Sequence, residues 1–429
     1  MYDLSIIGAG WAGFNAALRA RELGLKVCLI EKEKIGGTCL NLGCIPTKAL
    51  IQSAKVYALV KKSNSFGLEP ITPKINFLKA QERKERIVEQ LRQGMQFMLT
   101  DIDFLNGEAQ LLSNQEIKVG NQTVNTRFVL IATGSRPVEL RQFKFDAKRI
   151  VSSDDILNLK EIPDSLLIIG GGVIGCEFAS LFSSLETKVT IVEKMPQLLP
   201  GEDQEVAKKI ETIFKKRGIT VNTNSDATKL NLRDYNLILV CVGRKPQTEG
   251  LGLEKIGVKL DKGKVAVNEY LQTNVANIYA AGDSTGKLCL AHFAAYQGRI
   301  AAENIANPNE LKKAEDSNIP NCIFSDPEIA SVGLNEEVAR ERNMDVDVNK
   351  FDFLGSSMAR ILQETDGFIK IVSDRKTGGV LGASIIGPRA TELIAVLTLA
   401  ISSRLKISQI RSTIFAHPTL SESIYEALK

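Results

Sequence analysis

The chain has 429 residues, of which 44% are hydrophobic and 24% charged, and its formal net charge is +4. This length exceeds what one ordinary core fills and predicts two to four domains. The small net charge argues against nucleic acid or a membrane surface as partner, and no apolar run approaches the ~18 residues of a spanning helix.

The first 31 residues read as a strand, a glycine turn, a helix and a second strand. Gly8, Gly10 and Gly13 follow the first strand with the spacing G-x-G-x-x-G, and Glu31 ends the second strand. Glycines at such a turn let the backbone approach a pyrophosphate at the helix amino terminus, and the acid binds ribose hydroxyls. This unit therefore predicts a bound dinucleotide.

A close cysteine pair follows in the sequence GGTCLNLGCIPTK, where four residues separate Cys39 from Cys44. Pro46 suits the first turn of a helix, so we expect a helix over residues 47 to 60 with Cys44 at its amino terminus. The partial positive charge of that terminus lowers a thiol pKa below about 8.5, and Lys48 adds positive charge. Such a pair suits thiol–disulfide exchange.

Other interpretations of the pair stay open, among them two unrelated buried cysteines. A structural disulfide is disfavoured because seven cysteines spread over a long chain, with no secretory signal expected, indicate a reducing compartment. We expect the cytoplasm, or an organelle matrix after removal of a presequence. A zinc site needs further ligands, and neither a second close cysteine pair nor a nearby histidine is present, so we expect no metal.

The glycine pattern recurs after a long charged helix, expected over residues 76 to 100, and the strand of VLIATGSRP. Gly170, Gly172 and Gly175 follow an apolar strand, and Glu193 ends the next strand. Two unrelated glycine turns are the alternative, but each unit has its acid at the expected offset. Two fingerprints predict two dinucleotides, between which a hydride can pass.

The remaining sequence predicts more buried strands and then a change in the pattern of secondary structure. LILVCVGRKP and NIYAAGD read as strands ending in turns, and Asp283 is either a ligand at a strand end or a helix cap. From about residue 319 the pattern becomes one of antiparallel strands with flanking helices, which predicts an α+β unit.

The segment GGTCLNLGCIPTK resembles the redox-active disulfide of the pyridine nucleotide–disulfide oxidoreductases, and most closely that of the dihydrolipoamide dehydrogenases. The resemblance extends over both glycine fingerprints, ATGSRP, VGRKP, YAAGD and AHPTLSE. It implies an α/β fold with two Rossmann-like dinucleotide-binding domains and a carboxyl-terminal α+β dimerisation domain. The implied domains are an FAD-binding domain in two parts (1–142 and 265–316), an NAD-binding domain (143–264) and a dimerisation domain (317–429).

The resemblance also implies an activity. A homodimer would oxidise protein-bound dihydrolipoyl groups through a Cys39–Cys44 disulfide and FAD and reduce NAD. The substrate would be carried by a lipoylated acyltransferase or a glycine-cleavage H-type protein. The alternatives are a glutathione- or mercuric-reductase-like enzyme and a flavin-binding structural subunit with little turnover.

The family's functional residues transfer to matching positions. Cys44 would face the flavin, Cys39 would meet the substrate, and Lys48 would pair with Glu177. His417 would act as the base, oriented by Glu422 and supplied by the other subunit, after a peptide bond to Pro418 that is cis in the family. The implied FAD contacts are Gly8, Gly10, Gly13, Glu31, Gly37, Thr38, Lys48, Ala109, Thr133, Gly134, Asp283 and Ala291. The implied NAD contacts are Gly170, Gly172, Gly175, Glu177, Glu193 and Gly243.

Two further expectations concern the nicotinamide side and the second histidine. Glu193 favours NAD because a carboxylate repels a 2′-phosphate, although Lys194 follows it. The stretch after Thr223 is shorter than in the family, as though a hairpin were missing. We expect His292 to be structural.

Overall fold

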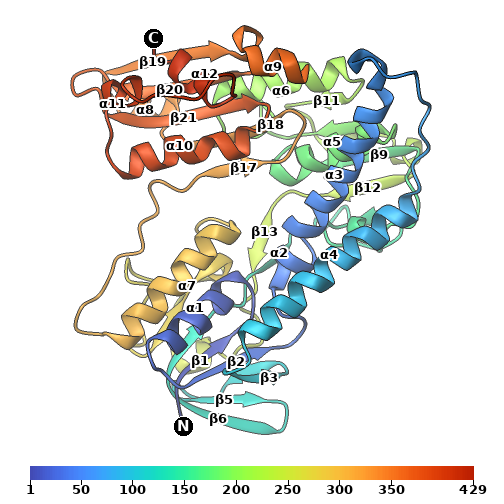
Figure 1. Cartoon of the computed structure of the whole chain (residues 1–429). Coiled ribbons are helices and arrows are strands. Elements are labelled where there is room, and N and C mark those ends of the chain that lie inside the picture. The colour runs from blue at the N-terminus through green and yellow to red at the C-terminus, as the bar shows by residue number, and fades with distance from the viewer.

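Three larger sheets organise the computed structural model, which describes residues 1 to 429 (Figure 1). The first sheet has the order β3-β2-β1-β6-β5-β4, with β16 paired to β6. Its strands are β1 (Tyr2–Ile7), β2 (Val27–Glu31), β3 (Asp103–Asn106), β4 (Ala109–Leu111), β5 (Glu116–Val119), β6 (Gln122–Ile131) and β16 (Ile278–Ala280).

The parallel part of this sheet creates one edge at which several loops begin. Ile7 of β1 lies opposite Ile30 of β2 and Ile131 of β6. The carboxyl ends of these strands therefore meet, and β16 ends beside them because Ala280 pairs with Ile131. Ligands of open α/β sheets bind at this kind of edge.

Two helices from distant parts of the chain cover one face of the first sheet. Figure 1 shows α1 (Trp11–Glu22) and α7 (Ala291–Ala306) lying side by side. Gly298 permits this approach, because a Cβ there would lie 2.1 Å from the backbone oxygen of Ala12. Buried alanines of both helices join the same core cluster.

The second sheet is fully parallel and repeats the arrangement with the order β11-β10-β9-β12-β8. Its elements are β8 (Ile150–Val151), β9 (Ser165–Ile169), α5 (Val173–Ser184), β10 (Lys188–Val192), α6 (Gln204–Lys216), β11 (Thr220–Asn222) and β12 (Leu237–Val240). Between β11 and β12 the chain forms only two 3₁₀ turns, Ala227–Lys229 and Leu232–Asp234. The expected shortening after Thr223 is thus visible as a crossover without a strand pair.

The third sheet is antiparallel, with the order β17-β18-β21-β20-β19. Its strands are β17 (Asn321–Ile323), β18 (Glu328–Gly333), β19 (Val346–Asp352), β20 (Phe368–Asp374) and β21 (Val380–Gly387). Its helices are α8 (Glu336–Glu341), α9 (Ser357–Leu362), α10 (Ala390–Ser402), α11 (Ile407–Arg411) and α12 (Glu422–Glu426). The predicted change to antiparallel strands near residue 319 is confirmed.

The remaining elements link the three sheets. They are α2 (Gly37–Asn41), α3 (Cys44–Lys61), α4 (Phe77–Met98), the antiparallel pair β7 (Ser135–Pro137) and β13 (Arg244–Pro246), and the pair β14 (Leu260–Asp261) and β15 (Lys264–Val265). The long helix α4 begins where the side chain of Asn76 accepts a hydrogen bond from the backbone N–H of Lys79. No helix combines the length and apolar character needed to cross a bilayer.

The predicted fold class is confirmed: two parallel α/β units are followed by an antiparallel α+β unit. The two units share one pattern because each has an apolar strand, a glycine turn and a helix at the same spacing.

Candidate functional site

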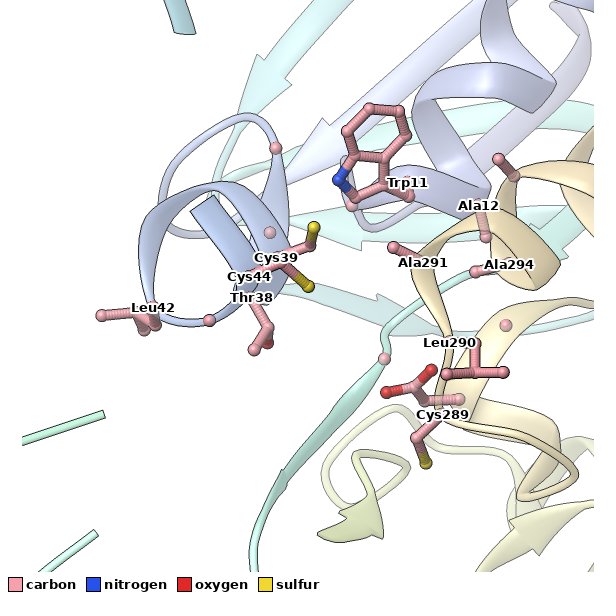
Figure 2. A pocket seen from close by; sticks show the side chains of 18 of the residues that line it. Trp11, Ala12, Thr38, Cys39, Leu42, Cys44, Cys289, Leu290, Ala291 and Ala294 are labelled. Carbon is pink, nitrogen blue, oxygen red and sulfur yellow. The ribbon is translucent and has the colours of Figure 1, made fainter. Parts of the chain in front are cut away.

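A cavity of about 1710 Å³ lies where the three units meet, and its lining includes both cysteines of the close pair. The lining includes residues of α1, α2, α3, α4, α5, α7 and α10, together with the loops at the carboxyl edge of the first sheet. Figure 2 shows the sulfurs of Cys39 and Cys44 close together, with Trp11 and Ala291 across from them.

The first glycine turn forms one wall of this cavity. Gly8 adopts φ +104°, and a Cβ there would lie 2.4 Å from the backbone oxygen of Ala132, so only glycine fits. The carboxylate of Glu31 accepts hydrogen bonds from the backbone N–H of Ala9 (2.7 Å) and of Glu33 (2.9 Å). Gly13 lies behind this wall, where it allows α1 to pack on the turn because a Cβ would lie 1.8 Å from the oxygen of Gly8.

The second glycine turn repeats this geometry outside the cavity. Glu193 is 8% exposed, and its carboxylate accepts hydrogen bonds from the backbone N–H of Gly171 (2.6 Å) and of Met195 (2.7 Å). Gly170 adopts φ +111° against the oxygen of Cys241. Glu31 and Glu193 thus accept equivalent backbone hydrogen bonds, as expected for two dinucleotide-binding units with the same fold.

The two cysteines are free thiols with different acidities. A hydrogen bond from Cys39 lowers the pKa of Cys44 to about 7, and the charge of Lys48 acts in the same direction against burial. The hydrogen bond to Cys44 and burial raise the pKa of Cys39. The predicted depression of the Cys44 pKa is confirmed, with Cys39 as its largest cause.

A partly buried ion pair lies one helical turn beyond Cys44, as expected from the resemblance. The ammonium of Lys48 donates to both carboxylate oxygens of Glu177, at 2.8 and 2.7 Å. Glu177 also accepts a hydrogen bond from the backbone N–H of Phe324 (2.9 Å), and Lys48 lies 4.7 Å from the centre of the Phe324 ring. This pair thus ties the first, second and third units together behind the cysteines.

A polar chain joins Asp283 to the β7–β13 pair through Ser135 and Arg244, two residues to which the sequence analysis assigned no role. Ser135 donates a 2.5 Å hydrogen bond to Asp283, and Arg244 donates to the hydroxyl (2.9 Å) and the backbone oxygen (2.8 Å) of Ser135. The motifs ATGSRP and VGRKP contain these residues, but their contact depends on the strand pairing. Asp283 is a cavity-lining acid, which favours the ligand interpretation over the helix cap.

The two histidines have different surroundings. The Nδ1 of His417 lies 2.8 Å from Glu422, and this hydrogen bond lowers the pKa of the carboxylate. The peptide bond between His417 and Pro418 is cis, as in the implied family. The His417 side chain is 70% exposed and lies outside the cavity lining of its own chain. His292 donates from Nε2 to the backbone oxygen of Pro320 (2.8 Å) at the cavity wall.

The other predicted contacts fall into two groups. Those expected for FAD line the cavity, with Gly13 as the exception: Gly8, Gly10, Glu31, Gly37, Thr38, Lys48, Ala109, Thr133, Gly134, Asp283 and Ala291. Of the residues expected for NAD, Glu177 lines it, whereas the glycines of the second turn, Glu193 and Gly243 lie outside it. No group of three or more His, Cys, Asp or Glu is arranged to hold a metal ion.

The cavity fits an extended dinucleotide such as FAD. Gly37 lets the start of α2 pack directly on the first glycine turn, because a Cβ there would lie 2.7 Å from the Gly10 Cα. The lining then runs from the ribose-type acid Glu31 to Asp283 and Ala291 beside the cysteine pair. An acid at one end and a thiol pair at the other match the two ends of a flavin dinucleotide.

Comparisons with known proteins agree with this geometry. A family model described as pyridine nucleotide-disulphide oxidoreductase matches residues 2–298, and one described as its dimerisation domain matches residues 319–428. A dihydrolipoyl dehydrogenase of Bacillus subtilis is 39% identical, over 99% of this chain and 97% of the relative. One of Geobacillus stearothermophilus is 41% identical, over 98% and 94%.

Solved structures have the same fold. LpdA from Mycobacterium tuberculosis matches with a TM-score of 0.91 at 28% identity, over 99% of both chains. The flavoprotein disulfide reductase RclA from Escherichia coli matches with a TM-score of 0.89 at 31% identity, over 100% of this chain and 99% of that one.

Proposed function

Because the chain belongs to the pyridine nucleotide-disulphide oxidoreductase family, we propose that it acts as a dihydrolipoyl dehydrogenase, an enzyme that uses FAD and NAD. The observation that carries the proposal is the placement of Cys39 and Cys44. Cys39 lies in α2 and Cys44 is the first residue of α3, both line the cavity that fits FAD, and their pKa values are shifted apart.

The two thiols have separate roles in this proposal. A substrate thiolate attacks the sulfur of Cys39 in the oxidised pair, the Cys39–Cys44 bond breaks, and Cys44 leaves with the electron pair. Cys44 suits the role of leaving group because its pKa is lowered to about 7. The second substrate thiolate then attacks the substrate sulfur, which releases Cys39 and the oxidised lipoyl ring.

FAD, when bound, supplies the two-electron chemistry between the reduced cysteine pair and NAD. The protein would hold its phosphates at the Gly8–Gly10 turn, its ribose at Glu31 and its flavin end near Asp283 and Lys48. The ion pair of Lys48 with Glu177 holds the lysine in place, because the carboxylate is also fixed by the backbone of Phe324. In the second unit, Glu193 would accept hydrogen bonds from the ribose of NAD.

Proton transfer requires a second copy of the chain in this proposal. His417, oriented by Glu422, would take the proton of the attacking thiol. It lies outside the cavity of its own chain, whereas the dimerisation-domain match supports a homodimer. The helix α10 lines the cavity and leaves Leu399 65% exposed, which suits contact with a partner chain.

The physiological substrate in this proposal is a lipoyl group on a partner protein, either a lipoylated acyltransferase or a glycine-cleavage H-type protein. The relatives' name supports this substrate class. We place the reaction in a reducing compartment, the cytoplasm or an organelle matrix, because seven cysteines spread over a long chain are not typical of a secreted disulfide framework.

The test is an anaerobic titration of the purified flavoprotein with dihydrolipoamide and, separately, with glutathione, followed by assays with NAD and NADP. We expect a long-wavelength absorption band with dihydrolipoamide and turnover with NAD. The variant C39S should lose the dithiol reaction and keep its FAD. Reduction by glutathione alone would instead support a glutathione-reductase-like enzyme, and a protein that stays oxidised under all donors would be a structural subunit.

A further inference from the structure

Trp11, the only tryptophan of the chain, has a buried hydrogen-bond donor in the cavity wall. Its indole Nε1 is shielded from solvent, and no protein acceptor completes a hydrogen bond with it. A buried donor without an acceptor costs free energy, so its retention needs a reason. The residue is the first of α1, directly after the glycine turn, and its position is therefore fixed by the fold.

The cysteine pair is the acceptor group that this donor faces (Figure 2). The hydrogen bond with Cys44 and burial raise the pKa of Cys39, whereas the indole N–H and the charge of Lys48 lower it by smaller amounts. Figure 2 shows Trp11 above the cysteine pair, with the indole nitrogen on the side of the ring that faces the pair. Cys44 and Lys48 both lie on α3, so Trp11 is the group that approaches Cys39 from the opposite wall.

We propose that the indole N–H of Trp11 donates a hydrogen bond to the sulfur of Cys39 whenever that sulfur carries negative charge during dithiol exchange. This inference rests on the proposed function, in which Cys39 is the thiol that meets the substrate. In the second exchange the bond between Cys39 and the substrate sulfur breaks, and the electron pair goes to Cys39. The sulfur then takes up the proton that the histidine base had removed.

The hydrogen bond has a specific use at this step. Cys44 already has Lys48 and the start of α3 to stabilise its thiolate, but Cys39 has a raised pKa and would be a poor leaving group without help. A donor aimed at a developing charge in a site that excludes water stabilises that charge strongly. Trp11 thus makes the release of Cys39 faster without changing the thiol that faces the flavin.

The test compares the purified holoprotein with the variant W11F and with a protein in which β-(3-benzothienyl)alanine replaces Trp11. The second change keeps the size of the ring and removes only the N–H, so it covers the case in which W11F folds poorly. The pH dependence of iodoacetamide alkylation at Cys39 is measured after anaerobic reduction by NADH. The reduction of the flavin by dihydrolipoamide and by NADH is measured in parallel.

We expect the apparent pKa of Cys39 to rise by about one unit in both altered proteins, which corresponds to about tenfold in thiolate population. The dihydrolipoamide reaction should slow by a similar factor, while reduction by NADH stays unchanged. The control is Y279F, which removes an aromatic hydroxyl that accepts from Gln272 (3.1 Å) in the same unit, away from the cavity lining.

An unchanged pKa of Cys39 in the benzothienyl protein would overturn the proposal, and so would an equal shift in Y279F. A wild-type protein that NADH reduces and dihydrolipoamide does not would contradict the proposed function instead. The pKa comparison still decides the hydrogen bond in that case, because alkylation needs no dithiol substrate.

Discussion

At the scale of single residues, the thiolate of Cys44 depends on the positive charge near it. The pKa of Cys44 is lowered to about 7 by the hydrogen bond from Cys39 and by Lys48. In the variant K48M we expect this pKa to rise by about one unit, since a nearby charge is lost. In the reduced wild type, the fraction of Cys44 present as thiolate should therefore increase between pH 6 and 8. In K48M the same increase should occur at higher pH.

The measurement is the pH titration of the long-wavelength band, or of Cys44 alkylation, in the reduced protein. The matched control is K55M, because Lys55 lies on the same helix and pairs with Glu328 (2.9 Å) away from the thiols. An identical titration in K48M and wild type would contradict the role of Lys48.

The carboxylate of Glu422 gives a second prediction at this scale. Its hydrogen bond to His417 fixes which ring nitrogen faces outward. In E422Q we expect the dithiol reaction to slow by about 10- to 100-fold and in H417Q by about 100-fold or more, because general-base catalysis is weakened or lost. Stopped-flow reduction by dihydrolipoamide measures this, and reduction by NADH should be unaffected. E426Q, on the same short helix, serves as control and should react like the wild type.

At the scale of elements, a buried lysine joins the second and third units. Lys370 of β20 is 1% exposed, and its ammonium lies 2.9 Å from Asp203, 2.9 Å from Glu205 and 2.7 Å from Glu336. In K370M the three carboxylates lose their shared cation, so we expect a loss of about 3–5 kcal/mol in stability. The thermal midpoint measures it, against K215M, whose exposed pair with Glu211 contributes about 0.3–0.5 kcal/mol.

The same cluster predicts a pH dependence of stability. The hydrogen bond from Lys370 lowers the pKa of Glu336, so the folded value lies below the unfolded value of about 4.3. Such a group contributes stability above its unfolded pKa and loses it as pH falls through the folded value. The difference in thermal midpoint between wild type and K370M should therefore shrink below about pH 4. A difference that stays constant down to pH 3 would argue against the ionic origin.

At the scale of the whole molecule, the proposed site needs residues from two chains. Cys39 lies in the cavity of one chain, and His417 is exposed on the third unit. Mixed dimers of C39S and H417Q chains would then have one intact site of two. Because random pairing makes half of the dimers mixed, co-expression should restore about a quarter of wild-type activity, although neither variant is active alone. Activity that stays absent in mixtures shown to contain mixed dimers would place both residues of a site in one chain.

Much of this protein was predictable from its sequence, because the decisive signals are local. A strand, a glycine turn, a helix and an acid lie within about 30 residues, so the spacing alone predicts each dinucleotide unit. The Cys39–Cys44 pair and the position of Cys44 at the start of α3 are local in the same sense. The hydrogen bond of His417 to Glu422 spans five residues and was predicted from the resemblance.

Only the tertiary structure decided which distant residues meet. Glu177 reaches the backbone of Phe324 because α5 packs against β17, and Arg244 reaches Ser135 because β7 pairs with β13. The cluster at Lys370 and the approach of Trp11 to Cys39 likewise depend on packing between separate elements. The physical reason is the distance along the chain over which each effect acts. Hydrophobic periodicity and turn residues determine the structure of one element, whereas contacts between units depend on how whole faces of helices and sheets pack.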